Sequence, residues 1–193
     1  MKMEQHYPNL IIGYHGCAKS LGLDVINGTK DLEPSKNKYV WLGSGIYFWE
    51  NDYDRALEFA TEYKKDDPFV VGAVLYLGNC LDLTQRKSSE IIKTSYDSLI
   101  EDSIKISITN RAGRQGGING DLLLRDLDCA VIQAIHDFHE KNGIKPYDSI
   151  RAAFWEGRDL YNTAGFKEKN HIQLCVRNPK CVLGYFLPRV SKR

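Results

Sequence analysis

Three short segments of the chain carry residue types that suit the binding of a planar ligand. Tyr14-His15-Gly16 closes an apolar stretch, residues 43–48 read Gly-Ser-Gly-Ile-Tyr-Phe, and residues 72–79 end in Leu-Gly-Asn. A tyrosine ring offers a large flat surface for stacking. A glycine lets the backbone approach a ligand without a Cβ in the way. Each segment alone is common, so its significance depends on the order and spacing of all three.

Local sequence patterns place these segments on secondary-structure elements. Residues 8–15 and 46–49 are rich in apolar, β-branched or aromatic side chains, which predicts two strands. A helix is expected over residues 52–65, capped by Asn51 or Asp52. Its predicted apolar face comprises Ala56, Phe59, Ala60 and Tyr63. Residues 69–83 form a β-rich segment that Gly78-Asn79 interrupts as a turn or bulge.

The second half of the chain shows one clear helix and several short strands. Residues 126–141 have apolar side chains at helical spacing, and Asn142-Gly143 provides a left-handed cap. The apolar positions are Leu127, Ala130, Val131, Ala134, Ile135 and Phe138. His136 and His139 lie on this helix without a third metal ligand, so we expect them at the surface. Short strands are expected within residues 151–157, 171–176 and 181–186.

This pattern predicts the α+β class, with split antiparallel β-sheets and flanking helices. We find neither an internal repeat nor a low-complexity linker, so residues 1–193 are interpreted as one domain. The net charge of +1 argues against a uniformly basic protein that coats a nucleic-acid duplex. From Arg151 onward, nine basic side chains face three acidic ones, which leaves room for a local basic surface.

The sequence contains no apolar run long enough to span a membrane and no apolar signal core, so we expect a cytoplasmic protein. Five cysteines form no Cys-x-x-Cys motif, which favours free thiols in a reducing compartment over a zinc site. No metal is therefore expected. Residues 111–117, Arg-Ala-Gly-Arg-Gln-Gly-Gly, are a flexible basic stretch that could contact a phosphate.

In their order and spacing, the three segments resemble the catalytic core of the ADP-ribosyltransferase superfamily. The branch they resemble is that of the poly(ADP-ribose) polymerases and diphtheria toxin, whose sites use a histidine, a tyrosine and a third residue. The resemblance covers residues 10–84 and, less fully, the last thirty residues. It implies an ADP-ribosyltransferase fold and NAD as the substrate, as in bacterial toxin-like members.

The resemblance also implies roles for individual residues. His15 would hydrogen-bond a ribose of NAD, and Tyr47 would form one wall of the nicotinamide slot. Gly16 and Gly45 belong to the same cofactor-binding segments. The family often places a second tyrosine eleven residues after the first, but that position is Glu58 here. Tyr53 or Phe59 would therefore have to supply the second wall.

The third catalytic residue is expected on the strand at 171–176. The family usually has a glutamate there, which holds a ribose hydroxyl and stabilises the oxocarbenium character of the transition state. This chain has Gln173 at the position we align with it, with His171 on the same strand face. A glutamine can hold a hydroxyl but cannot act as a base, so transfer of a single unit is favoured over polymer extension. A carboxylate could come from Glu156, which is flanked by aromatic residues, or from Glu168.

The loop before this strand is where members of the superfamily recognise their targets. Arg158, Tyr161 and Phe166 mix basic and aromatic character, which suits an exposed base with its phosphate or an acidic protein patch. An ordinary surface loop would have the same composition. The expected partners are therefore NAD and a macromolecular acceptor, either RNA, DNA or protein.

Three functional hypotheses follow. The first is an NAD-dependent mono-ADP-ribosyltransferase that acts as a toxin or antiviral defence effector and has an antitoxin or other inhibitor protein as a partner. The second is an NAD glycohydrolase, in which water is the acceptor. The third is a non-catalytic module that binds NAD, ADP-ribose or nucleic acid, for which the glutamine in place of glutamate is the only support.

Overall fold

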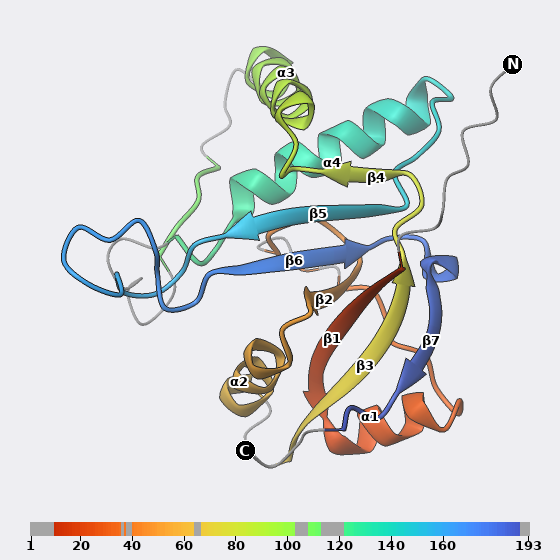
Figure 1. The fold of residues 1–193 in the computed structure, drawn as a ribbon. Coiled ribbons are helices and arrows are strands. Elements are labelled where there is room, and N and C mark those ends of the chain that lie inside the picture. Colours follow the sequence, from red (N-terminus) through yellow and green to blue (C-terminus); the bar gives the residue numbers. More distant parts are fainter. Residues whose placement is uncertain are drawn as a thin grey trace, which may run out of the picture.

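The computed structural model describes residues 10–35, 37, 40–63, 67–102, 108–112 and 122–189. Strands and helices alternate irregularly along the chain (Figure 1). In order, the elements are β1 (Leu10–Ala18), α1 (Lys19–Ile26), β2 (Ile46–Glu50), α2 (Tyr53–Tyr63), β3 (Pro68–Tyr76), β4 (Cys80–Asp82), α3 (Arg86–Asp102), α4 (Asp126–Lys141), β5 (Ser149–Phe154), β6 (His171–Val176), the short 3-10 helix η2 (Pro179–Cys181) and β7 (Val182–Phe186). The predicted mixture of helices and strands is confirmed.

The strands form one seven-stranded sheet in the order β4-β5-β6-β2-β1-β3-β7. All neighbours are antiparallel except β4 and β5, which run parallel. β1 pairs with β3 over nine residues but with β2 only at Gly13–Glu50 and Tyr14–Trp49. In Figure 1 the two halves of the sheet run in different directions on either side of β2. The expected split is therefore a divergence within one hydrogen-bonded sheet.

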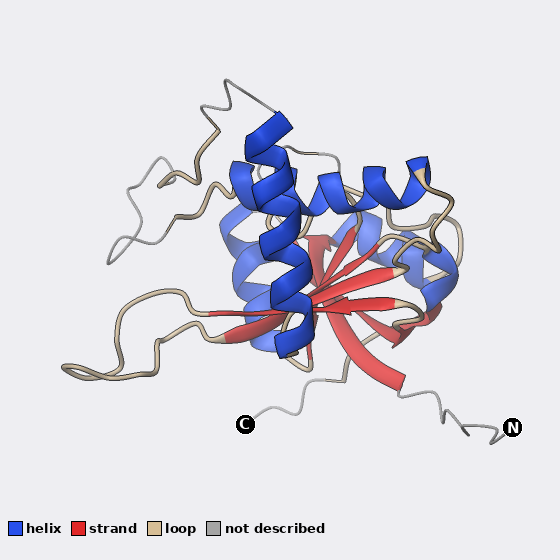
Figure 2. Ribbon diagram, turned by 90° about the horizontal axis from the view of Figure 1, so that it is seen from above, coloured by secondary structure: helices blue, strands red, loops and turns tan. Residues whose placement is uncertain are grey.

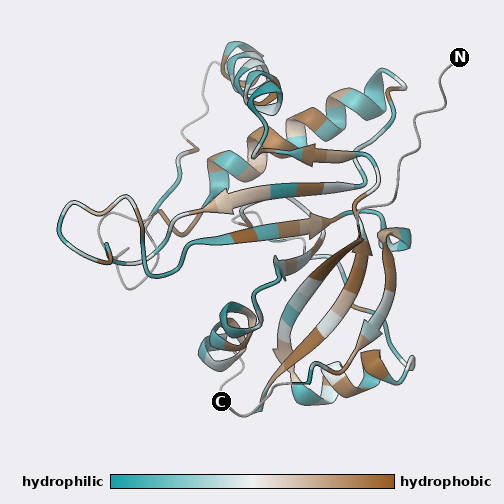
Figure 3. Ribbon diagram, in the orientation of Figure 1, coloured by the Kyte–Doolittle hydropathy of each residue, from teal (hydrophilic) through white to brown (hydrophobic). Residues whose placement is uncertain are grey.

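Two of the three apolar clusters hold α1 and α4 against this sheet. The first lies around Phe48, Leu75 and Leu174 and includes Val25 of α1. The second joins Leu81 and Ile150, on the parallel strand pair, to Ile132 and Ile135 of α4. The most hydrophobic parts of the ribbon are the strands, while the helices alternate between polar and apolar residues (Figure 3). These clusters fix the relative position of β2 and β6, on which the candidate site lies.

Helix α2 packs directly on β1 through two small residues. Asp52 caps the helix by accepting a hydrogen bond from the Arg55 backbone at 2.9 Å, as one of the two predicted caps. Ala56 and Ala60 are fully buried. A Cβ on Gly16 would lie 2.3 Å from the Ala56 carbonyl oxygen, so this glycine allows the helix to approach the strand. Tyr63, predicted on the apolar face, is 60% exposed because it lies at the last turn of the helix.

Helix α4 has the predicted bounds, and Gly143 after it adopts a φ of +62°. Two residue predictions on this helix are wrong. Phe138 is 59% exposed, whereas His136 is only 4% exposed. The inner stripe of the helix runs through Val131, Ile132, Ile135 and His136 because α4 rests on β5 while α3 packs beside it. Helix α3 was not predicted from its mostly polar sequence.

No disulfide joins the described cysteines. None of the helices in the described ranges has the length and apolar character needed to cross a membrane.

Candidate functional site

His15 and Tyr47 meet where β1 and β2 diverge. His15 lies one residue beyond the last β1–β2 pair, and its ring nitrogen Nδ1 is 2.8 Å from the backbone carbonyl oxygen of Tyr47. Because a carbonyl only accepts, Nδ1 is the protonated nitrogen in this hydrogen bond. The ring also packs edge-on against Phe48, with centroids 5.8 Å apart. Two residues 32 positions apart in sequence are thus held together at the split in the sheet.

The side chain of Tyr47 is anchored by its hydroxyl group. The hydroxyl donates to the Gly43 carbonyl at 2.6 Å and accepts from the Leu42 backbone nitrogen at 2.9 Å. Burial raises the pKa of this phenol well above its ordinary value, so it stays protonated. Gly45 has no room for a side chain, because a Cβ would lie 2.4 Å from the Cys175 sulfur. The Gly-Ser-Gly segment therefore folds around its own tyrosine and against β6.

Gln173 lies diagonally across from Tyr47 on the neighbouring strand. Tyr47 pairs with Cys175 and Trp49 pairs with Gln173, so Tyr47 and Gln173 share one face of the sheet. Gln173 is partly exposed, and its amide makes no hydrogen bond to any other described residue. His15 lies on the opposite face of β1, as the alternation with Cys17 shows. The structure therefore joins His15 to Tyr47 and sets Tyr47 near Gln173, while no bond between described residues connects His15 with Gln173.

The two candidates for a second aromatic wall both lie on α2 and contact other rings. Tyr53 packs edge-on against Tyr14 at 5.7 Å between centroids. Phe59 packs against Trp49 at 5.0 Å. In the described part of the chain neither ring contacts Tyr47. Glu58 lies on the same helix and belongs to a charge network around Arg55.

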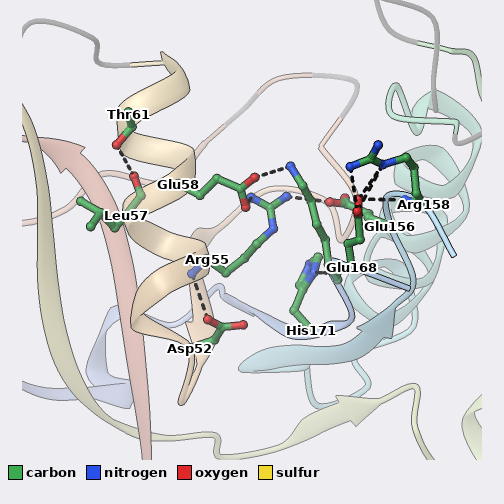
Figure 4. A network of polar contacts seen from close by, with 10 residues as sticks. Asp52, Arg55, Leu57, Glu58, Thr61, Glu156, Arg158, Glu168 and His171 are labelled. Atoms are coloured by element: carbon green, nitrogen blue, oxygen red, sulfur yellow. Dashed lines mark hydrogen bonds and ion pairs between the residues drawn. The ribbon is translucent and has the colours of Figure 1, made fainter. Parts of the chain in front are cut away.

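Glu156 is a member of a buried charge network rather than a free carboxylate. It is 6% exposed and accepts from the Arg55 guanidinium at 2.6 Å (Figure 4). Arg55 also lies 3.3 Å from Glu58, and Glu58 forms an ion pair with Lys169. The network thus connects α2 to the loop between β5 and β6. It also gives Glu156 a structural role, because the carboxylate neutralises a guanidinium that is itself largely buried.

His171 is a buried residue of this region for which no role was predicted. It is 7% exposed, and its Nδ1 lies 2.8 Å from the Lys169 carbonyl oxygen, which makes Nδ1 the donor. Burial lowers its pKa, so the ring is neutral and Nε2 carries a lone pair. Nε2 has no hydrogen-bond partner among the described residues. Trp41 and Phe154 pack on the ring, with centroids 6.2 and 5.7 Å away.

The loop between β5 and β6 projects from the body of the molecule (Figures 1 and 2). A bridge between Asp159 and Lys167 and an ion pair between Arg158 and Glu168 at 2.9 Å hold its two arms together. Glu168 is therefore engaged at the surface by Arg158. Four apolar side chains on this loop are more than half exposed: Trp155, Leu160, Tyr161 and Phe166.

The charges of this loop are mixed. Between residues 155 and 170 the three basic side chains are balanced by three acidic ones, so the net charge is zero. What the loop exposes is aromatic surface. The other predicted basic stretch begins at Arg111, which is paired with Asp126 at 2.9 Å. Residues 113–117 of that stretch lie outside the described residues. Among the described residues there is no group of three or more histidine, cysteine or acidic side chains arranged to hold a metal ion.

Comparison with known proteins gives one distant relative. The chain is 23% identical over 183 residues to the uncharacterized protein MJ0359 of Methanocaldococcus jannaschii, an alignment that covers 88% of this chain and 83% of that protein. No family model matches the chain, and no solved structure matches it. These comparisons supply no activity, so the functional argument depends on the residues themselves.

Proposed function

We propose that this protein is an NAD-dependent mono-ADP-ribosyltransferase, which cleaves the bond between nicotinamide and ribose and transfers ADP-ribose to a macromolecular acceptor. The main support is the contact between His15 and Tyr47 at the divergence of β1 and β2, because it unites the two sequence segments that resemble the family. The unengaged amide of Gln173, diagonally across from Tyr47, adds a group that can bind a ligand hydroxyl.

The reaction needs little covalent chemistry from the protein. The bond from ribose C1″ to the nicotinamide nitrogen breaks, and its electron pair leaves with nicotinamide, which becomes neutral. The ribose then has oxocarbenium character, and a nucleophile of the acceptor attacks C1″ and loses its proton to water. Gln173 would hold a ribose hydroxyl during this step, and the Tyr47 ring would offer a stacking face. A glutamine at this position favours one transfer and no polymer extension.

NAD fits these residues only in part. The open amide of Gln173 and the partly exposed Tyr47 are suited to a ribose and an aromatic ring. The spaces at Gly16 and Gly45 are filled by the Ala56 carbonyl and the Cys175 sulfur, so these glycines act through packing. NAD binding is therefore assigned to Tyr47 and Gln173, which share one face of the sheet. His15 lies on the opposite face and acts through its hydrogen bond to the Tyr47 carbonyl oxygen, and Glu156 takes no part in the chemistry.

The loop between β5 and β6 suggests how an acceptor would be bound. Its exposed Tyr161 and Phe166 are suited to stacking on an unpaired base or to packing on a protein surface. Glu168 balances the charge of Arg158, so we do not expect contact with a phosphate backbone to be the main role of Arg158. A toxin or defence role with an inhibitory partner belongs to the same proposal, on family resemblance alone.

Radiolabelled NAD tests this function. Purified protein is incubated with ³²P-labelled NAD and cell extract, and the labelled material is divided between nuclease and protease digestion. We expect macromolecular label in the wild type and its loss in Gln173→Ala, a change that removes no bond to a described residue. Gln85→Ala, on the surface before α3, is the matched control. Released nicotinamide without macromolecular label would instead indicate a glycohydrolase, and neither product would contradict both enzymatic readings.

A further inference from the structure

The sheet half formed by β1, β3 and β7 has an outer face, opposite to the core around Phe48. Successive residues of a strand alternate between the two faces, and directly paired residues share one face. Leu75 belongs to the core around Phe48, so its neighbour Val74 and the paired Ile12 point the other way. The outer face in this register comprises Leu10, Ile12, Val74 and Tyr76, together with Gly184 and Phe186 of β7.

This outer face is apolar and exposed. Leu10 is 55% and Tyr76 is 43% exposed, and Ile12 and Val74 are partly exposed. A Cβ added to Gly184 would meet no described atom within 4 Å, so the space above this part of β7 is open. Hydrophobic residues run along β1 and β3 (Figure 3). An antiparallel sheet that faces water normally carries polar residues on that side, but none of the six residues of the outer face is charged.

The described helices pack elsewhere on the sheet. Helix α1 lies on the opposite face, where Val25 joins the core around Phe48. Helix α2 covers only the adjoining area around Gly16 and Trp49. Helix α4 packs on the other sheet half, and α3 packs beside α4. The outer face therefore has the composition of a surface between two layers without a second layer from the described helices.

The chemistry of the outer face suits a second copy of the same chain. In a two-fold symmetric contact a face meets itself, so a charged residue near the axis would oppose its own copy. The outer face carries no charge, and the net charge of the whole chain is only +1, so repulsion between two copies is small. Two antiparallel sheets can pack face to face at about 10 Å, with apolar side chains interdigitating between them. Exposed Leu183 and Leu187 of the β7 region extend the apolar surface toward the sheet edge.

We propose that two copies of this protein form a symmetric dimer by packing the outer faces of their β1, β3 and β7 strands against each other. Three strands spaced about 4.8 Å apart give an apolar centre only about 14 Å wide, so the dimer belongs to the small and weak class of interfaces. This proposal is independent of the transferase function, because Tyr47 and Gln173 lie outside the outer face.

Sedimentation equilibrium of the full chain tests the dimer. Between about 1 and 500 µM protein, we expect a monomer–dimer equilibrium with a dissociation constant of about 10–100 µM. Tyr76→Lys should weaken dimerisation about tenfold or more, because it brings like charges into an apolar contact. Phe138→Lys is the matched control, since Phe138 is a 59% exposed aromatic residue on α4 and should not affect the equilibrium. A strictly monomeric wild type would overturn the proposal in favour of a different protein as the occupant of this face.

Two further readouts keep the test decisive if Tyr76→Lys does not fold. Leu10→Lys changes a more exposed residue at the start of β1 and should weaken the dimer in the same way. In the wild type, the methyl NMR signals of Ile12 and Val74 should shift with protein concentration, while those of exposed Ile144, after α4, should not. A dimer that persists in the folded lysine variants, or that forms without shifts at Ile12 and Val74, would also overturn the proposal.

Discussion

A buried histidine and an arginine lie near each end of strand β6: His171 with Arg55 at one end, and His136 of α4 with Arg177 at the other. The two arginines differ in how their charges are paired. Beside His171, the guanidinium of Arg55 is paired with Glu156 at 2.6 Å and lies 3.3 Å from Glu58. Beside His136, Arg177 has a neutral imidazole as its nearest partner and no carboxylate within 4.0 Å among the described residues. At the first end the charge is paired at contact distance, whereas at the second end the acidic groups that stabilise Arg177, Asp137 and Glu140, act on it from beyond 4.0 Å.

This difference has a consequence for stability. A buried cation whose counter-charge lies within the chain fastens elements together, here α2 and the loop between β5 and β6. A half-buried cation whose counter-charges are more distant interacts with them more weakly. On this basis, we expect the charges of the first end to contribute more to stability than the charge of Arg177 at the second end.

The largest effect is expected when one charge is removed at the Arg55 end of β6. Glu156→Gln leaves Arg55 largely buried with only the more distant Glu58, so the free energy of unfolding should fall by about 3–5 kcal/mol. Urea denaturation measures this directly. Glu168→Gln, in an exposed ion pair of the same loop, should shift the midpoint little. An unchanged midpoint for Glu156→Gln would contradict the structural role and return Glu156 to the list of catalytic candidates.

Acidification should weaken the fold through His136. Its pKa is about 4 in the folded protein, against 6.5 for an ordinary histidine, so between these values the unfolded chain binds the extra proton. The contribution of neutral His136 to the free energy of unfolding is therefore fully present above pH 6.5. It declines by about 3 kcal/mol in total as the pH falls toward 4. Arg177 and His139 act in this direction and Asp137 against it.

Unfolding free energies measured from pH 7 to 4 test this slope. His136→Gln should flatten it, while His139→Gln should retain it. His171, whose pKa is also lowered by burial, contributes with the same sign. If His136→Gln and the wild type lose stability in parallel, then His136 is protonated in the folded protein, which would contradict this account.

The smallest stability effect is expected at the Arg177 end of β6. Arg177→Gln removes a half-buried charge that has no internal ion pair, so the free energy of unfolding should change by less than about 1 kcal/mol. The matched variant Arg55→Gln leaves Glu156 buried without its partner and should cost several times more. Chemical denaturation of the two variants side by side sharpens the comparison, and equal losses would contradict it.

The sequence predicted those parts of the fold that a local pattern encodes. Strand β2, the capped helix α2 and the bounds of α4 follow from β-branched content, the Asp52 cap and helical periodicity. Helix α3 was missed although Ile92, Tyr96 and Leu99 recur at helical spacing in its mostly polar sequence. The parallel pairing of β4 with β5 was missed because it joins residues 69 positions apart through a long connection without a clear pattern.

The site was predictable only where its residues stand in motifs. His15 and Tyr47 were found in that way, and their contact is consistent with the reasoning that selected them. The partnership of Arg55 with Glu156 spans 101 positions, and no local signal reveals it. His136 was assigned to the surface because no third metal ligand accompanies it and His139, although its position next to Ile135 on the inner stripe of α4 could have indicated burial.

The proposed transferase activity is tested by transfer of label from ³²P-labelled NAD to macromolecules in cell extract, compared among wild type, Gln173→Ala and Glu156→Gln at equal folded fractions. The account predicts transfer by the wild type, loss of transfer in Gln173→Ala with an unchanged urea midpoint, and transfer per folded molecule near wild type in Glu156→Gln. A wild type that neither labels macromolecules nor releases nicotinamide, or a fully active Gln173→Ala, would contradict it.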